Sequence, residues 1–239
     1  MAVTTDDGVV WHDVECGSYT ADLPLWRELA AQTGGPILDV GAGSGRVAID
    51  LHRRGFEVHA LDVDAALLAA LERRAPGLPT HVADARDFSL GHRFSLVIAP
   101  MQTVQLLGGA RDREAFLRCA RRHLERGGLV AAALANALED FDEGEVDVAP
   151  DMREVDGVVY ASRPTAIRAD GDGFVLERLR ERVDRAGARS VENNRIRLAR
   201  VTVERLNAEG AALGFKPLQA RLVEATEDHV GSEVAVLRA

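Results

Sequence analysis

The sequence predicts an α/β protein with a largely parallel sheet covered by helices on both faces, followed by an antiparallel insertion. Three observations support this fold class. Residues 36–135 alternate short apolar runs with helical patterns, which is typical of a parallel sheet. Residues 157–203 carry period-two patterns instead, and the Asp-Gly-Asp-Gly run at 170–173 predicts a hairpin between two of them. Residues 204–239 then add a helix and two strands that close the chain.

The elements follow one another in a regular order. A helix at 24–32 suits Pro24, which fits a first helical turn, and the Gly-Gly-Pro run at 34–36 ends it. We expect strands at 37–40, 56–61, 80–83, 94–99 and 129–134, separated by helices at 46–54, 65–74 and 113–126. The insertion predicts strands at 158–168, 174–183 and 195–203, followed by a helix at 203–213 and strands at 218–225 and 233–237.

These elements group into three parts. Residues 1–35 are an N-terminal lead or cap, and residues 36–138 together with 204–239 form the core. Residues 139–203 form an acidic loop plus the antiparallel β insertion, which we expect to cover the substrate. The stretch 139–156 has nine acidic residues and one arginine, and it is interpreted as a loop. A solvated linker is the simpler explanation of its charge, and an amine-binding lid is the alternative.

The most informative segment is 37–45, where an apolar run ends in Gly41, Gly43 and Gly45. Glycine lets the backbone turn sharply and approach a ligand closely, and the next helix directs its free N–H groups to the same place. This arrangement predicts a nucleotide-type pocket at the end of the first strand. A dinucleotide fingerprint requires a third glycine where this chain has Arg46, so a standard NAD or FAD turn is disfavoured.

An acidic residue at the end of the second strand supports the same pocket. Asp62 lies about 20 positions beyond the glycine turn, where a carboxylate accepts hydrogen bonds from ribose hydroxyls. The alternative role for Asp62 is the N-cap of the helix at 65–74, but Asp64 fits that role better.

With these motifs in order, the chain resembles the class I S-adenosylmethionine-dependent methyltransferases. The glycine turn at 38–45 resembles their first motif, the segment 61–64 their second acidic strand end, and Asp84 their adenine-binding Asp. The Gly-Gly turn before 129–134 is similar to the entry of their fifth strand. The resemblance covers 37–135 closely. It implies a Rossmann-like seven-stranded sheet of order 3-2-1-4-5-7-6 with the last strand antiparallel.

The resemblance implies S-adenosylmethionine as the cofactor, with binding residues spread over five segments. They are Tyr19, Asp39, Gly41, Ala42, Gly43, Arg46, Asp62, Val63, Asp84, Ala85, Arg86, Ala99, Met101 and Gln105. Similar enzymes often lay an N-terminal tyrosine across the cofactor, although Tyr19 fits equally well as a packed aromatic residue. For Gln105 the alternative is a solvated helix position, and for Arg46 a guanidinium that points to water.

Methyl transfer to O, N or C of a small molecule is the predicted reaction. It is an in-line displacement that depends mainly on alignment in a dry pocket, and it needs a general base only if the acceptor must lose a proton. The sequence shows no convincing catalytic pair, so the catalytic residues stay unassigned. His12 is a candidate base, and Gln102 is a further candidate near the pocket.

Composition limits the other function classes. The net charge of −9 disfavours nucleic acid as a partner, because phosphate binding depends on clustered Lys and Arg. No run approaches the roughly 20 apolar residues of a membrane span, and the N-terminus shows no signal peptide. Cys16 and Cys119 show no paired spacing, which favours the cytoplasm, and no cluster has metal-ligand spacing.

Several alternatives stay open. Arg178, Arg180 and Arg182 would meet an anionic substrate or a second copy of the chain in a homodimer formed through the β insertion. A solvated sheet face with cross-strand ion pairs is the simpler explanation. The same fold would also suit a non-catalytic cofactor-binding protein or an aminopropyl transferase, although 100–103 lacks the acidic residues expected of the latter. An NAD-dependent oxidoreductase is the least favoured function.

Overall fold

The computed structural model describes residues 5–135, 140–142, 149–227 and 229–239. The chain divides into two compact units. The smaller unit consists of Met1–Ser18 and Leu138–Arg200, and the larger unit of Tyr19–Ala137 and Val201–Ala239. Each unit is described by itself below.

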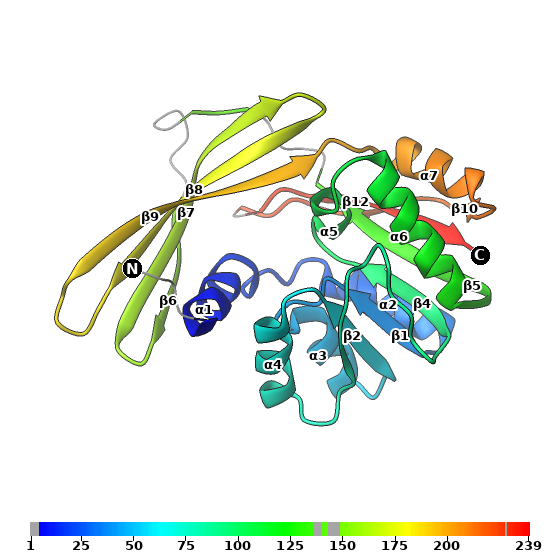
Figure 1. Cartoon of the computed structure of the whole chain (residues 1–239), viewed down its shortest axis with the longest axis horizontal. Helices are drawn as coiled ribbons and strands as arrows, with labels where there is room; N and C mark the ends of the chain where they lie inside the picture. Colours follow the sequence, from blue (N-terminus) through cyan, green and yellow to red (C-terminus); the bar gives the residue numbers. More distant parts are fainter. Residues whose placement is uncertain (1–4, 136–139, 143–148, 228) are drawn as a thin grey trace. The chain divides into compact units, whose positions relative to one another are not determined.

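The larger unit is built on one sheet, whose central strands are parallel (Figure 1). Its described strands are β1 (Ile37–Val40), β2 (Val58–Asp62), β3 (Thr80–Val82), β4 (Phe94–Ala99), β5 (Leu124–Leu134), β10 (Lys216–Pro217), β11 (Arg221–Val223) and β12 (Ser232–Arg238). The order β10-β12-β5-β4-β1-β2-β3, with β12 antiparallel to β5, confirms the predicted fold class. The predicted strand at 218–225 is replaced by two short ones, β10 and β11, which both pair with β12.

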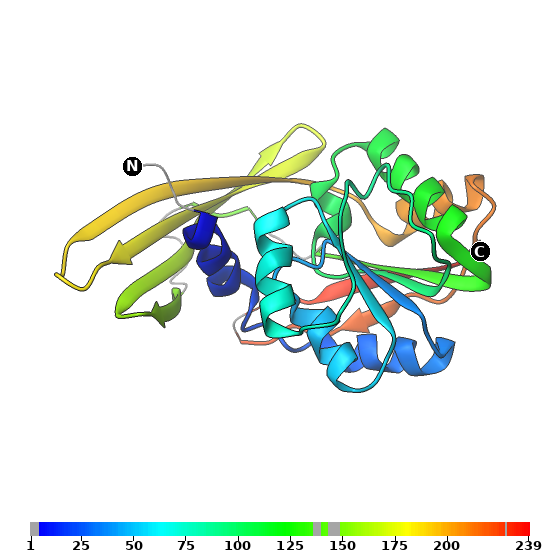
Figure 2. The ribbon, with the colours of Figure 1, turned by 60° about the horizontal axis from the view of Figure 1, so that its bottom comes forward.

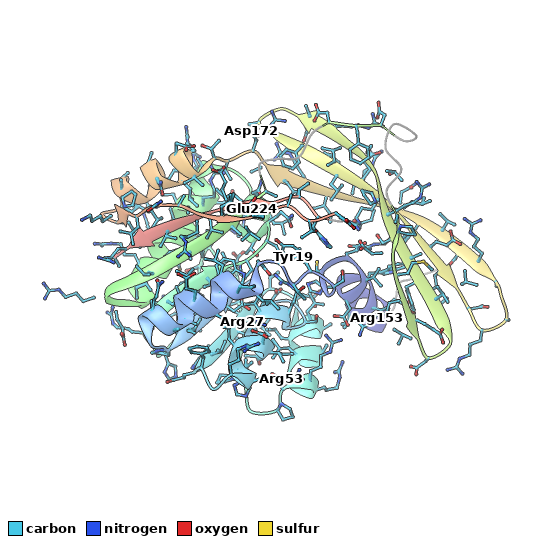
Figure 3. The ribbon with its side chains drawn as sticks, turned by 180° about the vertical axis from the view of Figure 1, so that it is seen from behind. Tyr19, Arg27, Arg53, Arg153, Asp172 and Glu224 are labelled. Atoms are coloured by element: carbon cyan, nitrogen blue, oxygen red, sulfur yellow. The ribbon has the colours of Figure 1, made fainter. Side chains whose placement is uncertain are left out.

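Helices cover both faces of this sheet (Figure 2). On one face lie α2 (Leu23–Thr33), α3 (Arg46–Arg53) and α4 (Ala65–Arg74), and on the other α5 (Thr103–Leu106), α6 (Ala110–His123) and α7 (Val203–Ala212). Strands buried on both sides are mostly apolar, as in β4, where all six residues are buried and Ser95 is the polar one. Arg27 of α2, labelled in Figure 3, pairs with Asp50 of α3 at 2.7 Å and so joins two helices of the first face.

Local signals fix the start of α4. The Asp64 carboxylate accepts hydrogen bonds from the backbone N–H groups of Ala66 (2.8 Å) and Leu67 (3.3 Å). These are donors that the first helical turn would otherwise leave without a partner. The prediction that Asp64 caps this helix is therefore confirmed, which leaves Asp62 free for another role.

The smaller unit is a four-stranded antiparallel sheet with one helix packed on it. The elements are α1 (Thr5–Cys16), β6 (Asp151–Val155), β7 (Val158–Asp170), β8 (Gly173–Val183) and β9 (Arg189–Ala199). Asp170 pairs with Gly173 across the β7–β8 turn, which confirms the predicted hairpin. Trp11 of α1 meets Tyr160 of β7 edge-on, with ring centroids 5.0 Å apart.

The arginine face of β8 is covered by α1, so the expected solvated face is wrong, whereas the expected cross-strand ion pairing is present between Arg180 and Glu192 of β9. The Arg178 and Arg180 side chains are only 12% and 17% exposed. Glu15 of α1 accepts hydrogen bonds from Arg180 at 2.7 and 2.9 Å, and Arg178 pairs with Asp151 of β6. Arg182 lies near the Tyr160 ring, 5.9 Å from its centroid. In this unit Arg180 and, at 3.6 Å, Arg178 attach α1 to its sheet through Glu15.

Further element predictions need correction, and one of them is β5, which begins at Leu124 instead of residue 129. The lead at 1–35 contains the additional helix α1, whose sequence has little apolar periodicity and whose apolar residues gain burial only by packing on the sheet. Residues 151–155 of the predicted acidic loop form the exposed strand β6; residues 139 and 143–148 of that loop lie outside the described structure. Helix α6 spans 110–123 instead of 113–126, and β9 spans 189–199 instead of 195–203.

Among the described residues, we find no helix with the length and apolar character that crossing a membrane requires.

Candidate cofactor site

The glycine turn after β1 has a backbone that only glycine adopts easily. Gly41, Gly43 and Gly45 all have positive φ values, of 70°, 55° and 99°. A Cβ atom on Gly41 would lie 2.6 Å from Cγ2 of Thr103, so a side chain there would also collide with the start of α5. The turn therefore brings backbone N–H groups to the carboxyl edge of the sheet without a side chain in the way.

Asp62 lies directly beside this turn. The N–H of Gly43 donates to Oδ2 of Asp62 at 2.8 Å, and the N–H of Asp64 donates to Oδ1 at 2.9 Å. The N–H groups of Gly41 and Ala42 both donate to the carbonyl of Leu61, which ties the turn to the end of β2. Each carboxylate oxygen of Asp62 has a further lone pair with which to accept a ligand hydroxyl.

Asp39 supplies a buried carboxyl group below the turn. Burial raises its pKa to about 8, and the Arg46 guanidinium and the N–H of Ala48 offset that effect only in part. Neither oxygen accepts a well-formed hydrogen bond from a described residue. A buried carboxylate of this kind is costly unless it meets a cation, so the position fits a positively charged ligand group.

Arg46, at the start of α3, is held inside the protein. Its guanidinium donates to both carboxylate oxygens of Asp22 (2.6 and 2.7 Å) and to the Tyr19 carbonyl (2.8 Å). Trp26 donates its indole N–H to the same Asp22 carboxylate at 2.8 Å. The suggestion that Arg46 points to water is therefore wrong: its side chain is 10% exposed and that of Asp22 is 3% exposed.

Tyr19, labelled in Figure 3, precedes α2, and its relative exposure is 5%. The Arg46 guanidinium carbon lies 5.1 Å from the centre of its ring. Burial raises the pKa of the Tyr19 phenol, and Asp22 adds to this effect, whereas Arg46 and Ser232 oppose it. Tyr19 is thus a packed aromatic residue within the cluster around Arg46, and a contact with cofactor stays a prediction.

Asp84 follows β3 and is half exposed, and its carboxylate is already paired. Arg86 donates to it through its side chain and its backbone N–H, which together lower the pKa of Asp84. Arg86 also pairs with Asp112 at 3.0 Å. Nearby, the Ala85 side chain is buried, whereas Val63, after β2, is 73% exposed. An exposed valine at a strand end offers an apolar contact to a planar ring.

The segment after β4 closes the site. Ala99 is fully buried, and Met101 has a φ of 54°, which is strained for a residue with a side chain. Gln105 is 1% exposed, and its amide hydrogen-bonds in both directions with the backbone of Ala135 at the end of β5. The alternative of a solvated Gln105 is therefore wrong; here it anchors α5 to the sheet. Gln102 caps α5 without a side-chain hydrogen bond.

One residue near this edge was not predicted from the sequence. The His229 ring lies against Tyr19, with centroids 4.9 Å apart and planes inclined by 37°. No local motif marks it, because its contact joins positions more than two hundred residues apart. His12, the candidate base, lies half-buried on α1 of the smaller unit.

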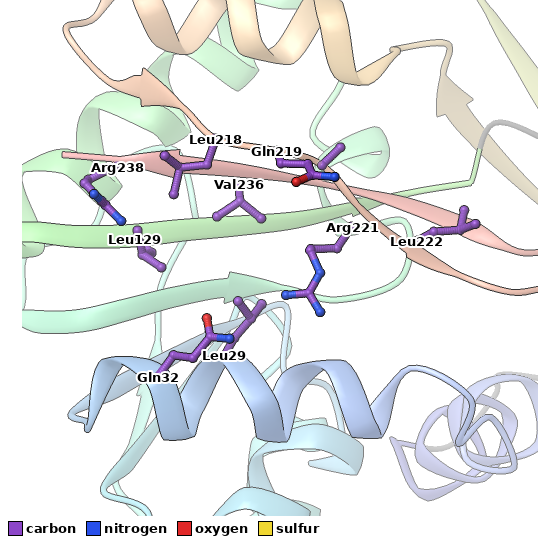
Figure 4. Close-up of a pocket in the computed structure, with 10 residues that line it drawn as sticks. Leu29, Gln32, Leu129, Leu218, Gln219, Arg221, Leu222, Val236 and Arg238 are labelled. Atoms are coloured by element: carbon purple, nitrogen blue, oxygen red, sulfur yellow. The ribbon is translucent and has the colours of Figure 1, made fainter.

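A hollow in the larger unit lies away from this site. One cavity, of about 410 Å³, lies beside α2 and the C-terminal strands (Figure 4). Leu29, Leu129 and Val236 form its apolar part and Arg221 and Arg238 its charged part, with no residue of the glycine turn among them. The described residues also contain no group of three or more His, Cys, Asp or Glu side chains placed to hold a metal ion.

Comparisons with known proteins agree with this arrangement. A family described as "Methyltransferase domain" matches residues 37–128. The chain is 30% identical over 206 residues to a dTDP-3-amino-3,6-dideoxy-alpha-D-glucopyranose N,N-dimethyltransferase from Streptomyces fradiae, covering 82% of this chain and 78% of that protein. It is 28% identical over 160 residues to a dTDP-3-amino-3,4,6-trideoxy-alpha-D-glucopyranose N,N-dimethyltransferase from Streptomyces venezuelae, covering 67% and 65%.

Solved structures share the fold. An amino pentose methyltransferase from Micromonospora echinaspora, solved with S-adenosylmethionine bound, has a TM-score of 0.72 at 22% identity, covering 100% of this chain and 98% of that one. A sugar N-methyltransferase from Streptoalloteichus has a TM-score of 0.73 at 24% identity, covering 97% and 92%.

Proposed function

Because the chain belongs to the class I S-adenosylmethionine-dependent methyltransferases, we propose that it methylates the amino nitrogen of a sugar carried on a nucleoside diphosphate. Its activity as a methyltransferase and its use of S-adenosylmethionine follow from the family. The acceptor is the proposed part. It is supported by the relatives, which are named as N,N-dimethyltransferases of amino sugars linked to dTDP.

The structural observation that supports cofactor binding at this site is the hydrogen bond from the Gly43 N–H to Oδ2 of Asp62, 2.8 Å long, beside the buried carboxyl group of Asp39. We assign the ribose hydroxyls of the cofactor to Asp62 and its cationic methionine portion to Asp39. Val63, Asp84, Ala85 and Arg86 would border the adenine, and Ala99 and Met101 the sulfur. Asp84 must then share its carboxylate between Arg86 and the adenine amino group.

Methyl transfer requires little of the protein beyond alignment of the two reactants and removal of water. The amine lone pair attacks the methyl carbon in line with the breaking carbon–sulfur bond, whose electron pair stays on sulfur. A protonated amine has no lone pair to donate, so the acceptor must lose a proton first. Family membership favours this reaction over aminopropyl transfer, hydride transfer to NAD and cofactor binding without turnover.

The test is direct. Purified protein is incubated with S-adenosylmethionine and dTDP-3-amino-3,6-dideoxyglucose, and the products are analysed by mass spectrometry. We expect the acceptor to gain one and then two methyl groups, and the same sugar nucleotide with a hydroxyl in place of the amine to gain none. Methylation of the hydroxyl analogue, or of neither compound despite tight binding of S-adenosylhomocysteine, would refute the proposed acceptor.

A homodimer formed through the β insertion and a cytoplasmic location stay predictions. The first is checked by sedimentation of the purified chain, and the second by fractionation of cells that produce it.

A further inference from the structure

The segment between β11 and β12 lies at the same edge of the sheet as the glycine turn. Glu233, near the start of β12, pairs antiparallel with Leu134 at the carboxyl end of β5. Since β5, β4 and β1 are parallel, their carboxyl ends share one edge. Residues just before Ser232 therefore approach the edge at which the glycine turn, Asp62 and Met101 are found.

The backbone holds His229 firmly within this segment. Its N–H donates to the hydroxyl of Thr226 at 3.0 Å, and its carbonyl accepts from the N–H of Thr226 at 2.9 Å. Gly231 lies close to the end of β11, since a Cβ atom on it would be 2.8 Å from the Val223 carbonyl oxygen. These two hydrogen bonds to Thr226 hold the backbone of His229 in place.

A chain of contacts leads from the His229 ring to the cofactor site. The ring packs on Tyr19, the Tyr19 ring packs under the Arg46 guanidinium, and Arg46 follows the glycine turn directly. The imidazole is half-buried, and within the described part of the chain neither ring nitrogen takes part in a hydrogen bond. A histidine so placed offers a proton acceptor.

We propose that His229 accepts a proton from the substrate amine before methyl transfer, an inference that rests on the proposed function. The ammonium group gives its proton to a ring nitrogen, and the freed lone pair forms the nitrogen–carbon bond while the carbon–sulfur bond breaks. The product is a methylammonium group, and the imidazolium passes its proton to water. A second transfer repeats the same proton step.

The charges around His229 suit this role. Tyr19 is the titratable side chain in contact with its ring, and behind it stand the paired Arg46 and Asp22 and the buried Asp39. In the described structure no carboxylate forms an ion pair with the imidazole, and an imidazole nitrogen with a free lone pair is able to accept a proton.

The experiment compares three substitutions in the full-length enzyme. His229→Phe keeps a ring to pack on Tyr19 but cannot accept a proton, His229→Asn keeps a polar group, and His229→Ala leaves space. Turnover of the amino sugar nucleotide is measured from pH 6 to pH 10, and S-adenosylhomocysteine affinity is measured by titration. We expect kcat at pH 7 to fall about 10²-fold or more in all three variants, with unchanged S-adenosylhomocysteine affinity.

Two further results separate proton transfer from packing. The difference in kcat between wild type and the variants should shrink as pH rises, because the amine then loses its proton to solvent. Added imidazole should restore turnover in the Ala variant but not in the Phe variant. A Phe variant with the wild-type kcat and pH profile would overturn the role of His229 and leave the proposed function intact. Wild-type protein that binds S-adenosylhomocysteine but methylates no amine would overturn both.

Discussion

Replacement of Asp39 by asparagine tests the electrostatics of the cofactor site. With a pKa of about 8, the carboxyl group is roughly nine-tenths protonated at pH 7 and about one-tenth protonated at pH 9. The cationic methionine portion of the cofactor would favour the ionised carboxylate. Binding at pH 7 should therefore release about 0.9 proton from Asp39, and binding at pH 9 about 0.1.

Calorimetric titration with S-adenosylhomocysteine, in two buffers of different ionisation enthalpy, measures this release. The ligand's own amine also titrates, so the informative quantity is the difference between wild type and Asp39→Asn, which removes the ionisable group and keeps its shape. Equal proton release in the two proteins at pH 7 would refute the reasoning, because the ligand would then displace no proton from Asp39.

The same pKa shift has a consequence for stability without cofactor. A carboxyl group whose pKa is raised on folding binds more protons in the native state, so its stabilising contribution is complete below about pH 4 and is lost as pH rises through about 8. The penalty at pH 8 is on the order of a few kcal/mol. At pH 8, Asp39→Asn should have a higher melting temperature than wild type. At pH 5, the difference between the two melting temperatures should be smaller.

Four further substitutions have defined outcomes. Asp62→Ala should weaken S-adenosylhomocysteine binding by about 1–3 kcal/mol in a titration. Asp64→Ala, which removes only the cap of α4, should lower the melting temperature alone; equal affinity losses in both variants would contradict the assignment. Asp22→Ala leaves the buried guanidinium of Arg46 without its carboxylate and should cost about 3–5 kcal/mol in urea unfolding, whereas a loss under 1 kcal/mol would show that the pair is solvated. In the folded protein, burial lowers the pKa of His59, and so do the neighbouring His81 and His92. As pH falls below about 6.5, the unfolded chain therefore binds a proton at His59 before the folded protein does, and the free energy of unfolding decreases. His59→Phe should flatten the fall in unfolding free energy between pH 7 and pH 5, and an unchanged slope would contradict this.

The parts of the fold that local patterns encode were predictable. The glycine turn, Asp64 and the hairpin at 170–173 each depend on residues that are neighbours in sequence. The approach of Asp62 to Gly43 could also be foreseen, because β1 and β2 are adjacent parallel strands and their carboxyl ends share one edge. These features do not require knowledge of distant contacts.

The features that the sequence did not predict depend on contacts between residues that are far apart in the chain. Helix α1 is a helix because Trp11 and Glu15 meet β7 and β8, and its own sequence has little amphipathic pattern. The burial of Arg46 depends on Asp22, and the position of Gln105 depends on the end of β5. His229 likewise gains its place only through Tyr19. No local propensity specifies such contacts.

A crystal structure with S-adenosylhomocysteine tests the central claim most directly. Our account predicts ribose hydroxyls within hydrogen-bonding distance of the Asp62 carboxylate, the ligand backbone against the turn at 41–45, and its ammonium group toward Asp39. Ligand density at any other edge of the sheet, with Asp62 still bonded only to Gly43 and Asp64, would contradict the account.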